Sequence, residues 1–162
     1  MDNFITDKLL FRKLTQDDKE IFIKLRMAYI TDTFENINGS NTKEIKNNLE
    51  LYFNEHINKK DFVGIICEYN GKIVSSAYLV IKNFPPNPSM VNGKTATLLN
   101  VYTFPEYRKN GIAKRIIEEI IKDAKLMGVN SIDLKSTDDG YNLYKNLGFT
   151  DDNKYENMIL TL

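Results

Sequence analysis

The stretch from Lys94 to Gly128 constrains the fold of this chain more than any other part of the sequence. Its first part, KTATLLNVYTF (94–104), is rich in β-branched and aromatic residues and stops at Pro105, which cannot donate to a strand ladder. Its last part, AKRIIEEIIKDAKLMG (113–128), places apolar residues along one helical face and ends in glycine, a typical C-terminal helix signal. The stretch therefore predicts a strand followed closely by a long amphipathic helix.

The rest of the sequence predicts further helices and strands around this unit. Thr15 and Asp18 form a capping-box pattern that would open a helix. Asn70-Gly71 separates two β-rich runs and predicts a hairpin with a type I′ turn. Further strands are expected at 8–15, 62–69, 72–81, 130–136 and 154–162, and further helices at 15–28, 42–57 and 139–148. The resulting order, β-α-α-β-β-β-α-β-α-β, is that of a mixed α/β chain.

Composition excludes several classes of protein. The chain has 162 residues and a formal net charge of +0, so no global field attracts nucleic acid or a membrane surface. The first residues lack the basic and apolar regions of a signal peptide, and no apolar run approaches the roughly 18 residues of a membrane span. Cys67 is the single cysteine, which predicts a reducing, cytoplasmic location.

The segment EYRKNGIAKR (106–115) concentrates positive charge at the expected start of the long helix. That end of a helix already carries positive partial charge, so basic residues there indicate an anion. Gly111 lets an anion approach the backbone, and Ala113 keeps the next turn narrow. Three side chains could neutralise phosphate oxygens: Arg108, Lys109 and Lys114. A solvated basic helix start with a chance glycine is the alternative, and neither a Walker A loop nor G-x-G-x-x-G is present.

Two segments resemble motifs of the GCN5-related N-acetyltransferase (GNAT) superfamily. VYTFPEYRKNGIAKRI (101–116) resembles motif A, in which R-x-x-G-x-[GA] binds the pyrophosphate of acetyl-CoA. STDDGYNLYKNLGF (136–149) resembles motif B, which typically ends in L-Y-x-x-x-G-F. The matching positions are Arg108, Gly111 and Ala113 in the first motif, and Leu143, Tyr144, Gly148 and Phe149 in the second. The order of elements is also similar over essentially the whole chain.

The resemblance implies a mixed, mostly antiparallel, twisted sheet of six to seven strands, flanked by about four helices. We expect residues 1–162 to form a single N-acetyltransferase domain that moves an acetyl group from acetyl-CoA to a primary amine. The amine would belong to a small molecule or a peptide and would attack directly, in a ternary complex, without a metal ion. The alternative is an acyl-CoA-binding sensor or regulatory module without turnover. Nucleic acid and membrane partners are not expected, and a homodimer is left open.

The resemblance also implies how acetyl-CoA, the co-substrate, would be held. The backbone of Val101, Tyr102 and Thr103 would hydrogen-bond the pantetheine arm. The turn and helix start would hold the pyrophosphate through Arg108, Lys109, Asn110, Gly111, Ile112, Ala113 and Lys114. Thr137 stands where many members have asparagine, and its hydroxyl can donate one hydrogen bond to the cofactor.

Tyr144 corresponds to the frequent general acid of the family. A departing thiolate has a conjugate-acid pKa of about 8.5 and a phenol one of about 10, so proton donation is only mildly uphill. A tyrosine that packs the helix against the sheet is the alternative. Tyr141, one helical turn earlier, lacks the motif position.

A general base is harder to find, since the expected strand at 94–104 holds no carboxylate. Thr97 or Asn100 could orient a water relay. Asp32 and Glu35 could attract a cationic amine, with solvated loop charges as the alternative. Five aromatic residues are candidates for lining an acceptor pocket or for the core: Tyr29, Phe34, Phe84, Tyr102 and Tyr107.

Overall fold

A computed structural model describes residues 8–34, 39–152 and 158–162 of the chain. Its strands are β1 (Leu9–Lys13), β2 (Phe62–Tyr69), β3 (Lys72–Asn83), β4 (Lys94–Thr103) and β5 (Ser131–Asp133). Its α-helices are α1 (Lys19–Thr33), α2 (Gly39–His56), α3 (Ile112–Leu126) and α4 (Asp138–Asn146). Short 3-10 turns at Gln16–Asp18 and Pro105–Tyr107 precede α1 and α3.

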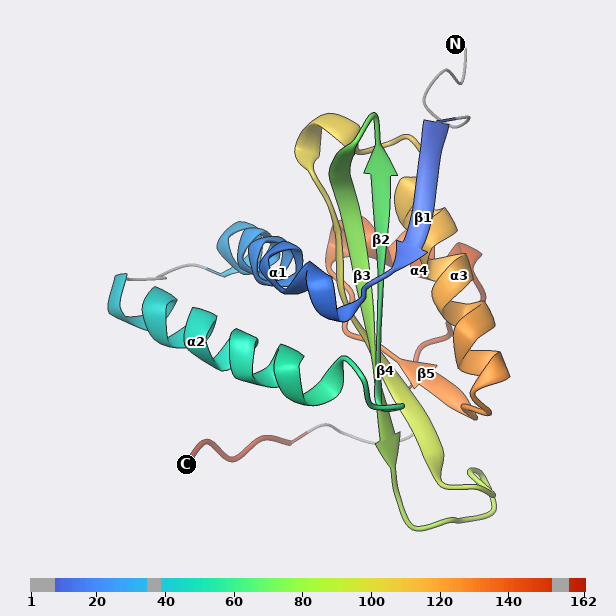
Figure 1. Cartoon of the computed structure of the whole chain (residues 1–162). Helices are drawn as coiled ribbons and strands as arrows, with labels where there is room; N and C mark the ends of the chain where they lie inside the picture. Colours follow the sequence, from blue (N-terminus) through green and yellow to red (C-terminus); the bar gives the residue numbers. More distant parts are fainter. Residues whose placement is uncertain (1–7, 35–38, 153–157) are drawn as a thin grey trace.

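The strands form one sheet in the order β1-β2-β3-β4-β5. The first three pairings are antiparallel and the last, between β4 and β5, is parallel. Helices α1 and α2 cover one face of the sheet, and α3 and α4 cover the other (Figure 1). The expected mixed, mostly antiparallel α/β fold is therefore confirmed.

The expected number of strands, six to seven, is too high for the described residues, which form five. The difference concerns the strand expected at 154–162. Residues 154–157 lie outside the described part of the chain, and residues 158–162 form no strand. Their apolar side chains are exposed, Met158 by 93% and Leu160 by 84%, so these residues have no buried face here.

Helix α3 forms because its apolar residues recur at helical spacing and bury one face against the sheet. Ile116, Ile117 and Ile120 are 0% exposed and lie in one cluster with residues of β2, β3 and β4. Each such isoleucine stabilises the fold by roughly 1.5–3 kcal/mol relative to an exposed one. This packing fixes the position of the first turn of α3 beside the end of β4.

Local chemistry explains the first helix and the hairpin. The Thr15 backbone N–H and hydroxyl both donate to Asp18 Oδ2, at 2.8 and 3.0 Å, so the expected capping interaction forms. It opens a 3-10 turn that continues into α1, and α1 extends to Thr33, beyond the expected end at residue 28. Asn70 and Gly71 have φ angles of 49° and 73°, the left-handed values that a type I′ turn requires.

Candidate active site

Strands β4 and β5 pair over a short distance and then part. Three residue pairs align, namely Thr95 with Ser131, Ala96 with Ile132, and Thr97 with Asp133. Strand β5 ends there, whereas β4 continues to Thr103. Within the described residues, the last part of β4 therefore has no strand neighbour on this side.

A β-bulge marks the point where β4 loses this neighbour. The register between β3 and β4 shifts between Ser76 and Tyr78, and Asn100 has a φ of +53°. Asparagine tolerates this left-handed conformation better than most residues. Leu99 and Asn100 both contact the α1 side of the sheet although they are adjacent in sequence, because the extra residue of a bulge breaks the alternation.

The bulge is held by a buried hydrogen-bond chain. Asn100 is 1% exposed, and its Nδ2 donates to Ser76 Oγ at 3.0 Å. Its Oδ1 accepts from Arg26 Nη1 of α1 at 3.3 Å. Arg26 was missed in the sequence, although one signal was present: it follows the buried Phe22 by four residues, which places it on the same face of the helix.

The end of β4 offers a ligand its backbone rather than its side chains. Val101 packs on the α3 side of the sheet. Tyr102 is 7% exposed and meets the Phe104 ring edge-on, with 5.2 Å between the ring centroids. Thr103 Oγ1 shares a hydrogen bond of 2.9 Å with Ser75 Oγ. These three side chains are occupied by packing or hydrogen bonding, and the backbone role expected for Val101, Tyr102 and Thr103 stays a prediction.

The turn between β4 and α3 is tightly folded. Lys109 and Gly111 have φ angles of 63° and 72°, and glycine adopts this region without steric cost. The Asn110 side chain folds back and donates to the carbonyl oxygens of Tyr107 and Arg108, at 3.1 and 3.0 Å. A Cβ atom on Gly111 would meet no other group within 4 Å, so the space beside this backbone is open.

The first turn of α3 has backbone donors to spare. Gly111 is the N-cap, and the first helical bond runs from Arg115 N to Gly111 O at 3.2 Å. The N–H groups of Ile112, Ala113 and Lys114 therefore have no partner within the helix. The Ile112 side chain is buried, whereas the Lys114 side chain is exposed. This end of α3 can bind an anion such as a phosphate.

Arg108 lies across the end of β4. Its Nε donates to the Thr103 carbonyl oxygen at 2.9 Å, and its Nη2 donates to Asp32 Oδ2 at 2.6 Å. The guanidinium also lies over the Tyr102 ring, 5.7 Å from the centroid. The two charged side chains are 48% and 46% exposed, so the ion pair contributes about 1 kcal/mol or less to stability. Of the two acids singled out in the sequence, Asp32 is thus paired, and Glu35 lies outside the described residues.

Helix α4 carries Thr137 and Tyr144. Thr137 is its N-cap, and the Thr137 Oγ1 accepts from Gly140 N at 3.3 Å. Accepting this bond leaves the Thr137 hydroxyl proton free to be donated elsewhere.

The end of α4 explains the spacing of motif B. The N–H of Phe149 donates to the Tyr144 carbonyl at 3.0 Å, and the N–H of Gly148 donates to the Lys145 carbonyl at 3.1 Å. With a φ of +92° at Gly148, this is a Schellman C-cap. The geometry returns the chain so that the Phe149 ring meets the Tyr144 ring edge-on, 5.8 Å between centroids.

Tyr144 is partly buried, and its hydroxyl makes no hydrogen bond to another described residue. Burial raises the pKa of Tyr144 above its ordinary value of 10.0, and the hydroxyl of Tyr29 in α1 raises it further. Tyr141, by contrast, donates its hydroxyl to the exposed carboxylate of Asp151 at 3.0–3.1 Å. The two tyrosines of α4 therefore face different surroundings, and only Tyr144 has a free hydroxyl.

Several other candidates are now placed. Thr97 Oγ1 is buried without a hydrogen-bond partner in the described part of the chain. Phe84 lies in the connection from β3 to β4, at the far end of β4 from Thr103, and is 49% exposed. Cys67 is fully buried in the core, and burial raises the pKa of its thiol to about 11. Among the described residues, no cluster of His, Cys, Asp or Glu is arranged to hold a metal ion.

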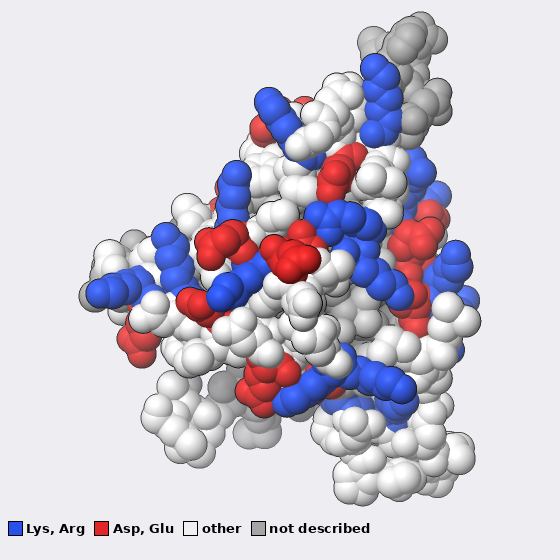
Figure 2. Space-filling model, in the orientation of Figure 1, with Lys and Arg blue, Asp and Glu red and all other residues white. Residues whose placement is uncertain are grey.

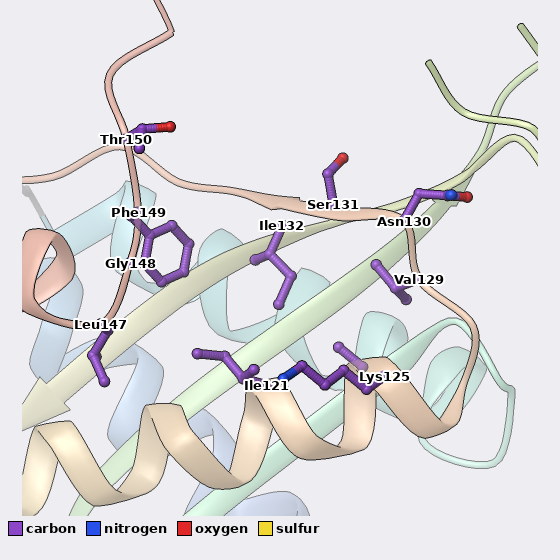
Figure 3. Close-up of a pocket in the computed structure, with 11 residues that line it drawn as sticks. Ile121, Lys125, Val129, Asn130, Ser131, Ile132, Leu147, Gly148, Phe149 and Thr150 are labelled. Atoms are coloured by element: carbon purple, nitrogen blue, oxygen red, sulfur yellow. The ribbon is translucent and has the colours of Figure 1, made fainter. Parts of the chain in front are cut away.

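A pocket of about 310 Å³ lies beside β5, away from the parted strands. Ile121 of α3, Ile132 of β5 and Phe149 point into this space (Figure 3). None of the residues expected to bind acetyl-CoA lines it, and neither does Tyr144. We therefore place the candidate site at the junction of β4, α3 and α4.

The family model of the acetyltransferase (GNAT) family matches residues 26–149 of this sequence. The match spans both the β4–α3 turn and the end of α4, and the chain belongs to this family. A comparison with curated proteins found no match. None of the helices in the described ranges is both long and apolar enough to cross a membrane.

Solved structures share the fold. A predicted acetyltransferase with acetyl-CoA from Clostridium acetobutylicum is 26% identical, with a TM-score of 0.83 over 93% of this chain and 96% of that chain. A GCN5-related N-acetyltransferase from Ralstonia eutropha JMP134 is 20% identical, with a TM-score of 0.79 over 93% and 98% of the two chains. Glucosamine-6-phosphate N-acetyltransferase from Arabidopsis thaliana is 20% identical, with a TM-score of 0.69 over 94% and 99%.

Proposed function

We propose that this protein transfers the acetyl group of acetyl-CoA to a primary amine of a small molecule or peptide. The amine would attack the thioester directly, in a ternary complex, and residues 1–162 would act as one N-acetyltransferase domain. A cytoplasmic location fits the single buried thiol of Cys67.

The observation that carries the proposal is the parting of β4 from β5 beside the start of α3. Strand β5 pairs with β4 only as far as Thr97, which leaves a gap along the last part of β4 among the described residues. The first N–H groups of α3 have no partner within the helix, and Tyr144 of α4 packs on the same side of the sheet as α3. A cofactor that lies in this gap along β4 would reach the start of α3.

The residues around the gap fit acetyl-CoA. The pantetheine arm would hydrogen-bond the backbone of β4 at Val101–Thr103, where β4 has no strand neighbour on this side among the described residues. The pyrophosphate would bind the free N–H groups at the start of α3, where the open space beside Gly111 permits close approach. Lys109, Asn110 and Lys114 would complete this cradle, and Arg108 would join it by releasing Asp32.

Tyr144 would supply the proton that the CoA thiolate needs when the C–S bond breaks. Its raised pKa keeps the phenol protonated throughout the neutral range, and its hydroxyl is not engaged by another described residue. The amine must in turn lose a proton. Thr97, with its unpartnered hydroxyl, and Asn100 at the bulge are the groups that could orient a water for that step.

Two alternatives are separated by simple observations. Basic and acidic side chains are interspersed on the face drawn in Figure 2, which argues against a nucleic-acid-binding stripe. The sensor alternative predicts acetyl-CoA binding without turnover. A screen of amines with acetyl-CoA, following free thiol release, tests the proposal. Amine-dependent thiol release supports it, and binding with no release from any amine favours the sensor.

A further inference from the structure

Arg26 differs from Arg12 and Arg108 in its charged partners. Arg12 forms ion pairs with Asp18 and Glu68, and Arg108 forms one with Asp32. Arg26 has no carboxylate within 4.0 Å among the described residues, and its side chain makes one hydrogen bond to them, to Asn100. A guanidinium has five N–H donors, so most of its capacity is unused.

This unpaired charge is also partly buried. Burial lowers the pKa of Arg26, whereas hydrogen bonding to Asp18 raises the pKa of Arg12. The guanidinium of Arg26 lies over the ring of Tyr29, 5.3 Å from its centroid. Burying a charge without a counter-ion is costly, so a ligand that supplied the opposite charge would offset that cost.

The position of Arg26 relates it to the reaction. Its hydrogen-bond partner Asn100 immediately precedes Val101, where the proposed pantetheine contacts begin. Its guanidinium lies over the ring of Tyr29 in α1, whereas Tyr144 packs on the α3 side of the sheet. A group bound to Arg26 would therefore lie on the α1 side of the gap, opposite the candidate acid.

We infer that Arg26 binds an oxyanion of the acceptor, so that the substrate is an amine that also carries a carboxylate or a phosphate group. This inference rests on the proposed acetyl transfer and narrows its acceptor. The planar guanidinium matches both anions through two parallel hydrogen bonds. Binding the anion would offset the burial of the charge and leave the amine free to reach the thioester. Asp32 and its partner Arg108 are both about half-exposed.

The first experiment compares acceptors that differ only in their anion. Glycine is compared with glycinamide, and glucosamine 6-phosphate with glucosamine, by thiol release from acetyl-CoA. We expect the wild type to favour the anionic member of the pair that it accepts. In Arg26→Gln, kcat/KM for that member should fall about 10- to 100-fold, the worth of a charged hydrogen bond. The neutral member should change little. Equal loss for both members would reduce Arg26 to a support for Asn100 and overturn the inference.

Lys24→Gln is the matched control, because it removes one positive charge from the exposed side of the same helix. It should keep the wild-type preference. Arg26→Lys keeps the charge but loses the fork, and should give an intermediate preference even if Arg26→Gln folds poorly. A preference for glycine over glycinamide would identify the anion as a carboxylate. A preference for glucosamine 6-phosphate over glucosamine would identify it as a phosphate. A wild type that prefers the neutral members would overturn the inference.

A second experiment does not depend on turnover. Inorganic phosphate and acetate are titrated by calorimetry into protein saturated with CoA, which occupies the N-terminal end of α3. Saturable binding of either anion is expected in the wild type and in Lys24→Gln, and a loss of at least about tenfold in Arg26→Gln. No anion binding in the wild type, or unchanged binding in Arg26→Gln, contradicts the inference. Failure of the proposed function is seen separately, as absent thiol release in protein that binds CoA, and the comparison of these two variants still holds in that case.

Discussion

The backbone N–H of Phe149 donates to the carbonyl of Tyr144 at 3.0 Å, and the same turn sets their rings edge to edge at 76°. One helix end thus fixes the orientation of the tyrosine that we propose as the acid. Gly148, with its φ of +92°, makes the return possible. The L-Y-x-x-x-G-F spacing therefore fixes the orientation of the tyrosine ring.

Tyr144→Phe should keep the ring packing and lose the proton donor. We expect kcat to fall about 10²- to 10⁴-fold, with the Kd for acetyl-CoA nearly unchanged. Because the pKa of Tyr144 is raised above 10.0, the alkaline limb of the wild-type pH–rate profile should lie above that value and should disappear in the variant. Tyr141→Phe, whose hydroxyl binds Asp151 at the surface, should leave both the rate and the profile unchanged. A wild-type kcat in Tyr144→Phe would leave the residue with a packing role.

Gly111→Val should abolish tight acetyl-CoA binding, measured by calorimetry, because a branched side chain would fill the open space beside the backbone. The φ of +72° also makes valine strained, at a cost of about 1–3 kcal/mol. Gly71→Val controls for that strain, since Gly71 has a φ of +73° and equally open surroundings in the β2–β3 turn. Both variants should lose similar stability in thermal unfolding, and only Gly111→Val should lose the ligand. Equal affinities in the two variants would argue against the cradle.

Asp18 should make folding stability depend on acid pH. Hydrogen bonding from Arg12 is the main cause that lowers the pKa of Asp18 from 3.8 to about 2. A carboxyl with a lowered folded-state pKa stabilises the fold above its unfolded value, and that stabilisation is lost as pH falls from 3.8 toward 2. Asp18→Asn should therefore lower the free energy of unfolding by roughly 2 kcal/mol at pH 7, with a shrinking difference below pH 3.8. Urea denaturation at pH 7 and at a pH below 3.8 measures the free energy of unfolding, with Asp17→Asn as the exposed control. A difference independent of pH would contradict it.

Asp32→Asn should strengthen acetyl-CoA binding several-fold at low salt. The carboxylate of Asp32 holds Arg108 Nη2 at 2.6 Å, and it competes with phosphate for the same guanidinium. The gain should shrink as salt rises, since the pair is exposed and screened. Arg108→Gln should show the opposite change in Kd by calorimetry. An affinity that does not respond to Asp32→Asn would mean that Arg108 stays at Thr103 when the ligand binds.

Features with local causes could be predicted from the sequence. The turn at Asn70-Gly71 and the glycine that opens α3 follow from residues that are neighbours in the chain. The Thr15–Asp18 cap is equally local. Family membership followed from the two motifs at 101–116 and 136–149, and the family match confirms it.

Features with distant causes could not be predicted. The contact of Arg26 with Asn100 joins residues 74 positions apart, and that of Arg108 with Asp32 joins residues 76 apart. Neither contact leaves a periodic pattern in the sequence. The bulge at Asn100 and the pairing of Arg108 with Asp32 were therefore not predicted. The strand expected at 154–162 could not be judged from the sequence, because an apolar run forms a strand only where a partner edge and a buried face are available.

A strand edge without a neighbour can accept a further strand or a ligand, and the last part of β4 is such an edge within the described residues. If acetyl-CoA lies along it, the ligand becomes in effect a missing strand of the sheet. Binding of the ligand would then stabilise the folded state. At a ligand concentration about 100 times Kd, the free energy of unfolding would rise by about 2.7 kcal/mol. The lifetime of the protein against proteolysis would follow the acetyl-CoA supply, so that a cell poor in acetyl groups would hold less of the protein that consumes them.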